Sequence, residues 1–275
     1  MATAPHSHLA ATRVSPEGRT PAHTLMVLHG IFGRGRNWTT LARQLAEARP
    51  DWSAWLVDLR RHGASPDLGP PHTVAATAAD LVALEDATRQ EAAAVLGHSF
   101  GGKVALVHAA GGHDHLSQVW IIDSTPEARA PRGSAWRLLD VVRALPPAFA
   151  SRQAAADALA GSGCSPAVAA WMASNLRFSH GRYVWRLDFD VMEALLRDFF
   201  RVDLWDVVED PPPGTVLHFV KANNSTVLSE EGCARIAEAR RRHGRVFLHR
   251  VAGGHWLHVD NPEAILRLLA THLPR

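Results

Sequence analysis

The sequence predicts an α/β fold, a mostly parallel, twisted sheet flanked by helices. Three observations lead to this class. Short apolar runs alternate with segments in which apolar residues recur at helical spacing, as in βαβ units. Several runs end in glycine or polar residues, where strands give way to loops. The chain has 275 residues, 47% of them hydrophobic, enough for a large buried core.

The first half of the chain supplies most of this rhythm. Apolar runs predict an early edge strand and four further strands, at residues 8–14, 23–30, 53–60, 92–99 and 116–124. Helical spacing predicts the intervening helices at residues 37–48, 73–90 and 100–110. Thr73 precedes the second of these as an expected N-cap, because its hydroxyl can accept from a first-turn amide.

The rhythm breaks at residues 126–213, which read as helical and contain no obvious strand. Strands and helices then return at residues 214–222, 229–244, 245–254 and 261–273, and Pro262 falls near the first turn of the last helix. We therefore expect a core of residues 1–125 and 214–275. A helical cap of residues 126–213 is expected after the sixth strand, since so long an insertion in a compact domain is usually functional.

Ser99 lies at the junction of an expected strand and helix, in the stretch GHSFG. This stretch matches G-x-S-x-G, in which small flanking residues allow a sharp turn to lift the serine above the sheet. The helix that follows directs amide donors to the same point. The pattern alone is short, but the strand before it and the helix after it favour a nucleophile.

A serine hydroxyl needs a base to take its proton. In this architecture the base is expected late in the chain, after the last strand. His255 follows two glycines there, and His258 is its local rival. We favour His255, because the carboxyl end of that strand faces the serine.

The acid is harder to assign. The strand at residues 214–222 is followed by Asn223 and Asn224 and by no carboxylate before Glu230. Asp123, which ends the strand after the serine strand, is the best candidate, although it could simply cap the next turn. Three other acids near the end of the insertion are less favoured by their position in the sequence: Asp203, Asp206 and Asp210. Ser225 is expected to support the acid or the histidine by a hydrogen bond.

Charge that develops on a substrate oxygen requires fixed donors. We expect the backbone amide of Phe100 and that of Ile31, with Phe32 as the neighbouring possibility. Gly30 allows close approach of that loop, and His29 beside it is expected to have a supporting, structural role.

Composition excludes several classes. The net charge of +2, without clustered basic residues, disfavours nucleic-acid binding. Two cysteines are too few for a disulfide framework or a zinc knuckle, and fit a reducing compartment. No secretory signal or membrane span is evident. We expect a cytoplasmic protein that uses no cofactor or metal, and its oligomeric state is not predicted.

Motifs that recur in order along nearly the whole chain resemble the α/β-hydrolase superfamily: LHGIFG, DLRRHGAS, GHSFGGKVA, VWIIDSTPE and GGHWLHVDNP. GRYVWR in the insertion, and an Asn-Ser pair where other members carry Asp, resemble the YbfF-type esterases and related eukaryotic α/β-hydrolase-domain proteins. The resemblance implies ester hydrolysis without a cofactor, a helical cap, Asp123 as the acid and Ser225 in support. Phe100 departs from the smaller residue or Met usual after the serine.

Three functions remain. The first is a serine esterase that cleaves small-molecule acyl esters or thioesters through an acyl-enzyme. The second keeps the triad but cleaves carbon–carbon bonds or transfers acyl groups. The third is a catalytically weak small-molecule binder, supported by the missing carboxylate near Asn223.

Overall fold

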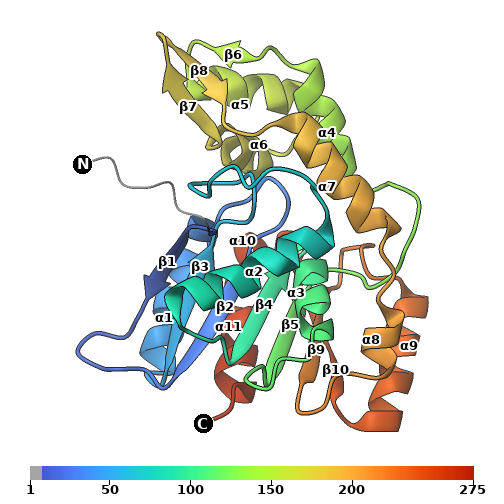
Figure 1. The fold of residues 1–275 in the computed structure, drawn as a ribbon. Helices are drawn as coiled ribbons and strands as arrows, with labels where there is room; N and C mark the ends of the chain where they lie inside the picture. Colours follow the sequence, from blue (N-terminus) through green and yellow to red (C-terminus); the bar gives the residue numbers. More distant parts are fainter. Residues whose placement is uncertain (1–7) are drawn as a thin grey trace.

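The computed structural model describes residues 8–275, and its centre is a seven-stranded sheet (Figure 1). The strand order is β1-β3-β2-β4-β5-β9-β10, with β1 antiparallel to β3 and the remaining neighbours parallel. Their bounds are β1 (Ala11–Val14), β2 (His23–Leu28), β3 (Trp52–Val57), β4 (Ala94–His98), β5 (Gln118–Ile122), β9 (Val216–Ala222) and β10 (Val246–Val251). The expected mostly parallel sheet with an early edge strand is confirmed.

Helices cover both faces of the sheet, so its strands are apolar on both sides. In β2, Met26 and Leu28 join one buried cluster, while Leu25 and Val27 join another on the opposite face. The first cluster includes residues of α2 (Val74–Thr88), α3 (Phe100–Ala110) and α9 (Glu230–His243). The second includes residues of α1 (Thr39–Ala48), α10 (Leu257–Asp260) and α11 (Pro262–His272).

The helix ends follow local sequence signals. The Thr73 side chain accepts a hydrogen bond from the amide of Ala76, so it caps α2 as expected. Gly244, with φ +66°, ends α9 in a left-handed conformation that glycine adopts without strain. Pro262 is the first residue of α11, where a missing N–H costs nothing.

The insertion between β5 and β9 is not purely helical, which corrects the sequence-based expectation. Besides its helices it contains a three-stranded antiparallel sheet of order β6-β8-β7, formed by β6 (Ala148–Phe149), β7 (Leu176–Ser179) and β8 (Arg182–Trp185). Strands this short carry too little apolar periodicity to be recognised, and the turn between β7 and β8 rests on positive φ at His180 and Gly181. The helices are α4 (Ser134–Ala144), α5 (Arg152–Gly161), α6 (Pro166–Ala173), α7 (Phe189–Arg201) and α8 (Trp205–Glu209).

The insertion also follows the fifth strand along the chain, β5, and not the sixth as expected, because a single antiparallel strand precedes the parallel ones. Most of it lies above the carboxyl ends of the parallel strands (Figure 1). The short helix α8 instead packs against α3 and α9 of the core, within the range expected to be cap. Residues 1–7 of the expected core lie outside the described residues.

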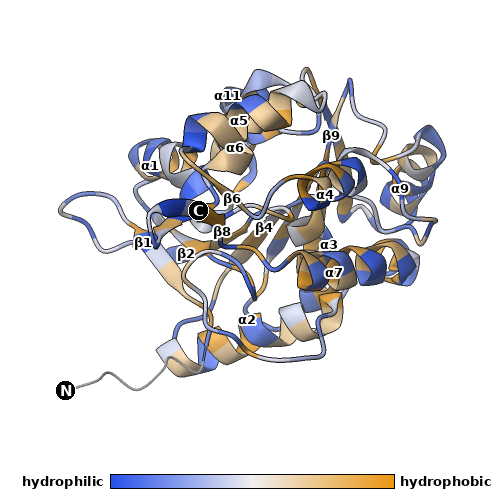
Figure 2. Ribbon diagram, turned by 90° about the horizontal axis from the view of Figure 1, so that it is seen from above, coloured by the Kyte–Doolittle hydropathy of each residue, from blue (hydrophilic) through white to orange (hydrophobic). Residues whose placement is uncertain are grey.

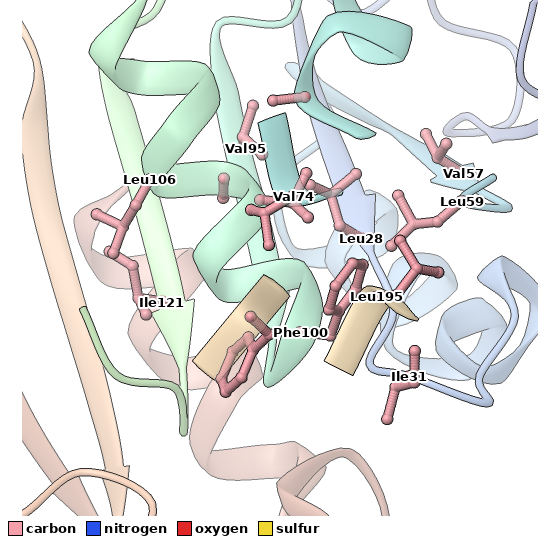
Figure 3. Packing of buried hydrophobic residues seen from close by; sticks show 14 of the residues in the cluster. Leu28, Ile31, Val57, Leu59, Val74, Val95, Phe100, Leu106, Ile121 and Leu195 are labelled. Carbon is pink, nitrogen blue, oxygen red and sulfur yellow. The ribbon is translucent and has the colours of Figure 1, made fainter. Parts of the chain in front are cut away.

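Helix α7 packs the insertion, called the cap below because most of it lies above the carboxyl ends of the parallel strands, against the core. Its ribbon alternates between apolar and polar residues (Figure 2), as expected for a helix with one buried face. Leu195 of α7 belongs to the same buried cluster as Leu28 of β2 and Leu59, and Figure 3 shows the three side chains together. The cap position relative to the sheet is therefore set by apolar packing.

Candidate active site

Ser99 occupies a strained turn between β4 and α3. Its backbone has φ +52° and ψ −114°, outside the regions that non-glycine residues favour. Two glycines make the turn possible. A Cβ on Gly97 would lie 2.0 Å from the Gly101 carbonyl oxygen, and one on Gly101 would lie 2.6 Å from that of His29. Gly97 therefore allows β4 to pass close to α3, and Gly101 allows α3 to pass close to the end of β2 and the loop after it.

His255 lies between Ser99 and Asp123. Its Nε2 is 3.0 Å from Ser99 Oγ, and its Nδ1 is 2.7 Å from Asp123 Oδ2. Asp123 directly follows β5, is buried, and uses Oδ1 to accept from the amide of Ala222 at 3.1 Å. This arrangement favours the tautomer with the proton on Nδ1, which leaves the Nε2 lone pair directed at the serine hydroxyl.

The rival residues have other contacts. His258 stacks on Trp38 with ring centroids 5.1 Å apart, and burial lowers its pKa to about 4. Asp203 accepts from the amides of Ala128 and Trp205 and so stabilises a turn. Within the described residues, neither Asp203 nor Asp206 nor Asp210 bonds to His255.

The loop after β2 brings Gly30, the residue before Ile31, beside the serine. Gly30 lies so near Ser99 that an added Cβ would be 3.3 Å from the serine Cβ. The Phe32 amide already donates to His62 Nε2 at 3.2 Å. Of the two amides considered for a substrate oxygen, that of Phe32 is therefore already engaged, which leaves that of Ile31 as the candidate.

His29 holds this loop through both ring nitrogens. Nδ1 donates to the Gly30 carbonyl at 2.8 Å, and Nε2 accepts from the Leu59 amide at 3.0 Å. Burial lowers the pKa of His29 to about 4, so the ring is neutral near pH 7 and can serve as donor and acceptor at once. This contact set is structural.

Phe100 provides the other expected amide, at the first position of α3, where helical amides have no partner within the helix. Its ring is buried and lies 6.3 Å from the ring of Phe199 in α7. Figure 3 shows Phe100 and Ile31 at the same edge of the packed cluster. The large side chain therefore forms part of the contact between core and cap.

Ser225 differs from expectation. Its Oγ accepts from the amide of Val227 at 3.2 Å, and it makes no hydrogen bond to Asp123 or His255 within the part of the chain described. The Asn-Ser loop turns back on itself at this point, since the Ser225 amide donates to the Ala222 carbonyl. Ser225 lines the cavity instead.

Three further residues support the site and were missed by sequence reasoning. His98 lies 2.8 Å from the His255 carbonyl through Nε2. Asn175 of the cap donates to the Phe32 carbonyl at 2.7 Å. Lys103 is fully buried and donates to the carbonyls of Glu127, Phe199 and Val202 at 2.7–2.9 Å, which joins both ends of the insertion to α3. Only His98 and Lys103 adjoin a recognisable motif.

A cavity of about 690 Å³ opens on Ser99 and His255. Its apolar lining includes Phe100 and, from α7, Leu196 and Phe199. Among the described residues, no group of three or more His, Cys, Asp or Glu is arranged to hold a metal ion. None of the described helices is long and apolar enough to span a bilayer.

Comparison with known proteins identifies the family of the chain. The sequence profile of the Alpha/beta hydrolase family matches residues 25–268. The chain belongs to this family. The relatives of this alpha/beta hydrolase include Escherichia coli esterase YbfF, 29% identical over 90% of the chain and 92% of that protein. A mouse protein named sn-1-specific diacylglycerol lipase ABHD11 is 25% identical over 94% of the chain and 83% of that protein.

Among solved structures, a marine microorganism esterase shares the fold of this alpha/beta hydrolase. The TM-score is 0.80 at 21% sequence identity, over 95% of the chain and 97% of that structure. Together with the esterase and lipase relatives, this places the alpha/beta hydrolase among the carboxylic-ester hydrolases.

Proposed function

We propose that the protein hydrolyses acyl esters or thioesters through an acyl-enzyme on Ser99. Ser99 Oγ attacks the acyl carbon while its proton passes to His255 Nε2, and Asp123 stabilises the imidazolium that forms. The amides of Ile31 and Phe100 donate to the oxyanion. The imidazolium then protonates the departing alcohol or thiol, and water, deprotonated by His255, releases the acid and regenerates Ser99.

One observation carries this proposal: the continuous hydrogen-bonded chain from Asp123 through His255 to Ser99. A serine, an imidazole and a carboxylate in this order activate the hydroxyl as a nucleophile. An aspartate nucleophile, as epoxide hydrolysis needs, is absent from position 99.

Fluorophosphonate labelling tests the activated serine. We expect one label on wild-type protein, found on the peptide that contains Ser99, and none on Ser99→Ala. Ser225→Ala is the matched control, because Ser225 lines the same cavity without contacting His255, and it should label normally. Absence of label on wild type would favour the weak-binder alternative.

Substrate panels separate the remaining alternatives. We expect release of acid from 4-nitrophenyl esters with an initial burst of 4-nitrophenol when deacylation is slow. Turnover of diketones without esters would indicate carbon–carbon cleavage. Transfer of the acyl group to an added alcohol in preference to water would indicate an acyltransferase.

A further inference from the structure

Four basic residues line the cavity that holds Ser99 and His255: Arg129, Arg132, Arg137 and Lys221. One carboxylate, Glu230, lines it with them. Its two oxygens lie 2.5 and 3.1 Å from the guanidinium of Arg250, outside the cavity lining, and Oε1 also lies 3.9 Å from Lys221 Nζ. The cavity therefore has a surplus of positive charge in a chain whose net charge is only +2.

Two of these cations are unpaired. Arg132 and Arg137 are exposed to solvent, and neither side chain makes a hydrogen bond or an ion pair within residues 8–275. Arg143, elsewhere on the cap, is by contrast paired with Asp190 and Glu193. The two unpaired guanidiniums belong to residues that line the same cavity as Ser99, the candidate nucleophile.

Arg129 adds a less mobile charge. One Nη donates to the Val227 carbonyl at 2.8 Å, and the guanidinium lies 5.8 Å from the Phe200 ring centroid. Its Nε is buried and has no partner among the described residues. Burial, and repulsion from Arg132, lower the pKa of Arg129. An anion nearby would therefore stabilise the charged form of its guanidinium.

The start of helix α4 reinforces this potential. Gly133 at its N-cap offers no side chain to the first amides, and the first turn contains no acidic residue. Gly133, Ser134 and Ala135 line the cavity. Free amides at a helix start carry partial positive charge, which adds to that of the arginines.

We infer that the cavity selects substrates with an anionic group, a carboxylate or a phosphate, held by Arg132 and Arg137 while Ser99 attacks the ester. Guanidinium groups suit both anions, because their N–H donors pair with two oxygens at once. The inference rests on the proposed esterase function, and it makes these arginines determinants of specificity.

The first test compares two esters that differ at one end, which is charged in the first and methylated and neutral in the second. 4-Nitrophenyl hydrogen adipate carries a free carboxylate, and 4-nitrophenyl methyl adipate is its neutral match. We expect wild type to show a kcat/KM at least about tenfold higher for the charged ester, mainly through KM. The advantage should shrink as ionic strength rises, since these side chains are exposed.

Variants assign the effect to the cavity. Arg132→Gln combined with Arg137→Gln should bring the ratio of the two esters close to one, through a loss of kcat/KM for the charged ester. Arg132→Lys in place of Arg132→Gln should restore part of the preference for the charged ester. Arg267→Gln removes an exposed arginine of α11, outside the cavity, and should leave the ratio at its wild-type value. Equal ratios in wild type and the double variant would overturn the inference.

A second pair of substrates identifies the anion. 4-(Phosphonooxy)phenyl butyrate, compared with its dimethyl phosphate ester, places a phosphate on the leaving group. A preference for this ester alone assigns phosphate, and a preference for the adipate alone assigns carboxylate. No preference in either pair rejects an anion subsite.

Binding to Ser99→Ala separates this inference from the proposed function. Calorimetry with adipate and with inorganic phosphate needs no turnover. We expect binding of at least one anion, weakened about tenfold or more when Arg132→Gln and Arg137→Gln are added. Binding without Ser99 labelling of wild type would reject the esterase and keep the anion site. Labelling of wild type without anion binding would reject the anion site and keep the esterase.

Discussion

Asp123 Oδ2 lies 2.7 Å from Nδ1 of His255, although 132 residues separate them along the chain. The carboxylate directly follows β5, whereas β9, the strand between β5 and β10, is followed by Asn223 and Asn224. The end of β9 still contributes, because the Ala222 amide donates to the second oxygen of Asp123. The neighbouring strand thus orients a carboxylate that it does not supply.

Replacing Asp123 with Asn should lower kcat by a factor of about 10⁴, because a neutral amide cannot stabilise the imidazolium and favours the wrong tautomer. The fold should survive, since Asn tolerates the φ of +43° at this position. Steady-state kinetics with a neutral 4-nitrophenyl ester and a thermal melt give the two readouts. Asp203→Asn, which alters a rival carboxylate, should leave turnover near normal. Near-normal rates in Asp123→Asn would reject the assignment.

Gly97→Ala should destabilise the protein by about 1–3 kcal/mol and abolish labelling of Ser99, because its Cβ would meet the Gly101 carbonyl oxygen at 2.0 Å. The backbone of β4 or that of α3 must move, and Ser99, which lies between them, moves with it. Urea denaturation measures the loss. Gly161→Ala, in a helix where nothing lies within 4 Å of the new Cβ, is the control and should be neutral or stabilising. Equal effects of both changes would contradict the steric explanation.

Asn175→Ala should reduce kcat/KM about tenfold, because the Phe32 carbonyl loses its donor and the adjoining Ile31 amide is no longer held. The unpaired carbonyl should also cost about 1–3 kcal/mol of stability. Kinetics at a temperature well below the melting transition separate the two effects. Asn223→Ala, on an exposed loop, should change neither quantity. Unchanged kinetics in Asn175→Ala would show that the cap does not position this loop.

Stability should fall as the pH drops from about 6.5 towards 4. Burial lowers the pKa of His29 to about 4 and that of His62 to about 3. In this window the unfolded chain binds protons that the folded chain excludes, so acid favours unfolding. Each histidine should contribute about 1.4 kcal/mol per pH unit within its window.

Urea denaturation at pH 7, 6 and 5 measures this slope. His29→Asn keeps a donor near the Gly30 carbonyl but does not titrate. The slope of its unfolding free energy against pH should therefore be smaller by the contribution of one proton, about 1.4 kcal/mol per pH unit. Asn223→Ala, on an exposed loop, removes no titratable group and should leave the slope unchanged. An identical slope in His29→Asn and wild type would contradict the buried neutral state of His29.

Local signals determined much of this molecule. The apolar runs predicted the parallel strands, Thr73 predicted the start of α2, and the GHSFG stretch placed a serine between strand and helix. These features depend on neighbours in sequence, through backbone dihedral preferences, capping and strand alternation. The small strands of the cap gave no such signal, because two to four residues are too few to establish a period.

Only the tertiary structure decided how the distant pieces meet. The sequence named Asp123 and His255, but their separation of 2.7 Å depends on the parallel order of β5, β9 and β10, which brings three carboxyl ends to one edge. It misjudged Ser225, whose hydroxyl bonds to Val227, and it overlooked Asn175 and the unpaired arginines of the cavity. Contacts between side chains that are distant in sequence depend on how the helices and the sheet pack together, and no local sequence pattern predicts them.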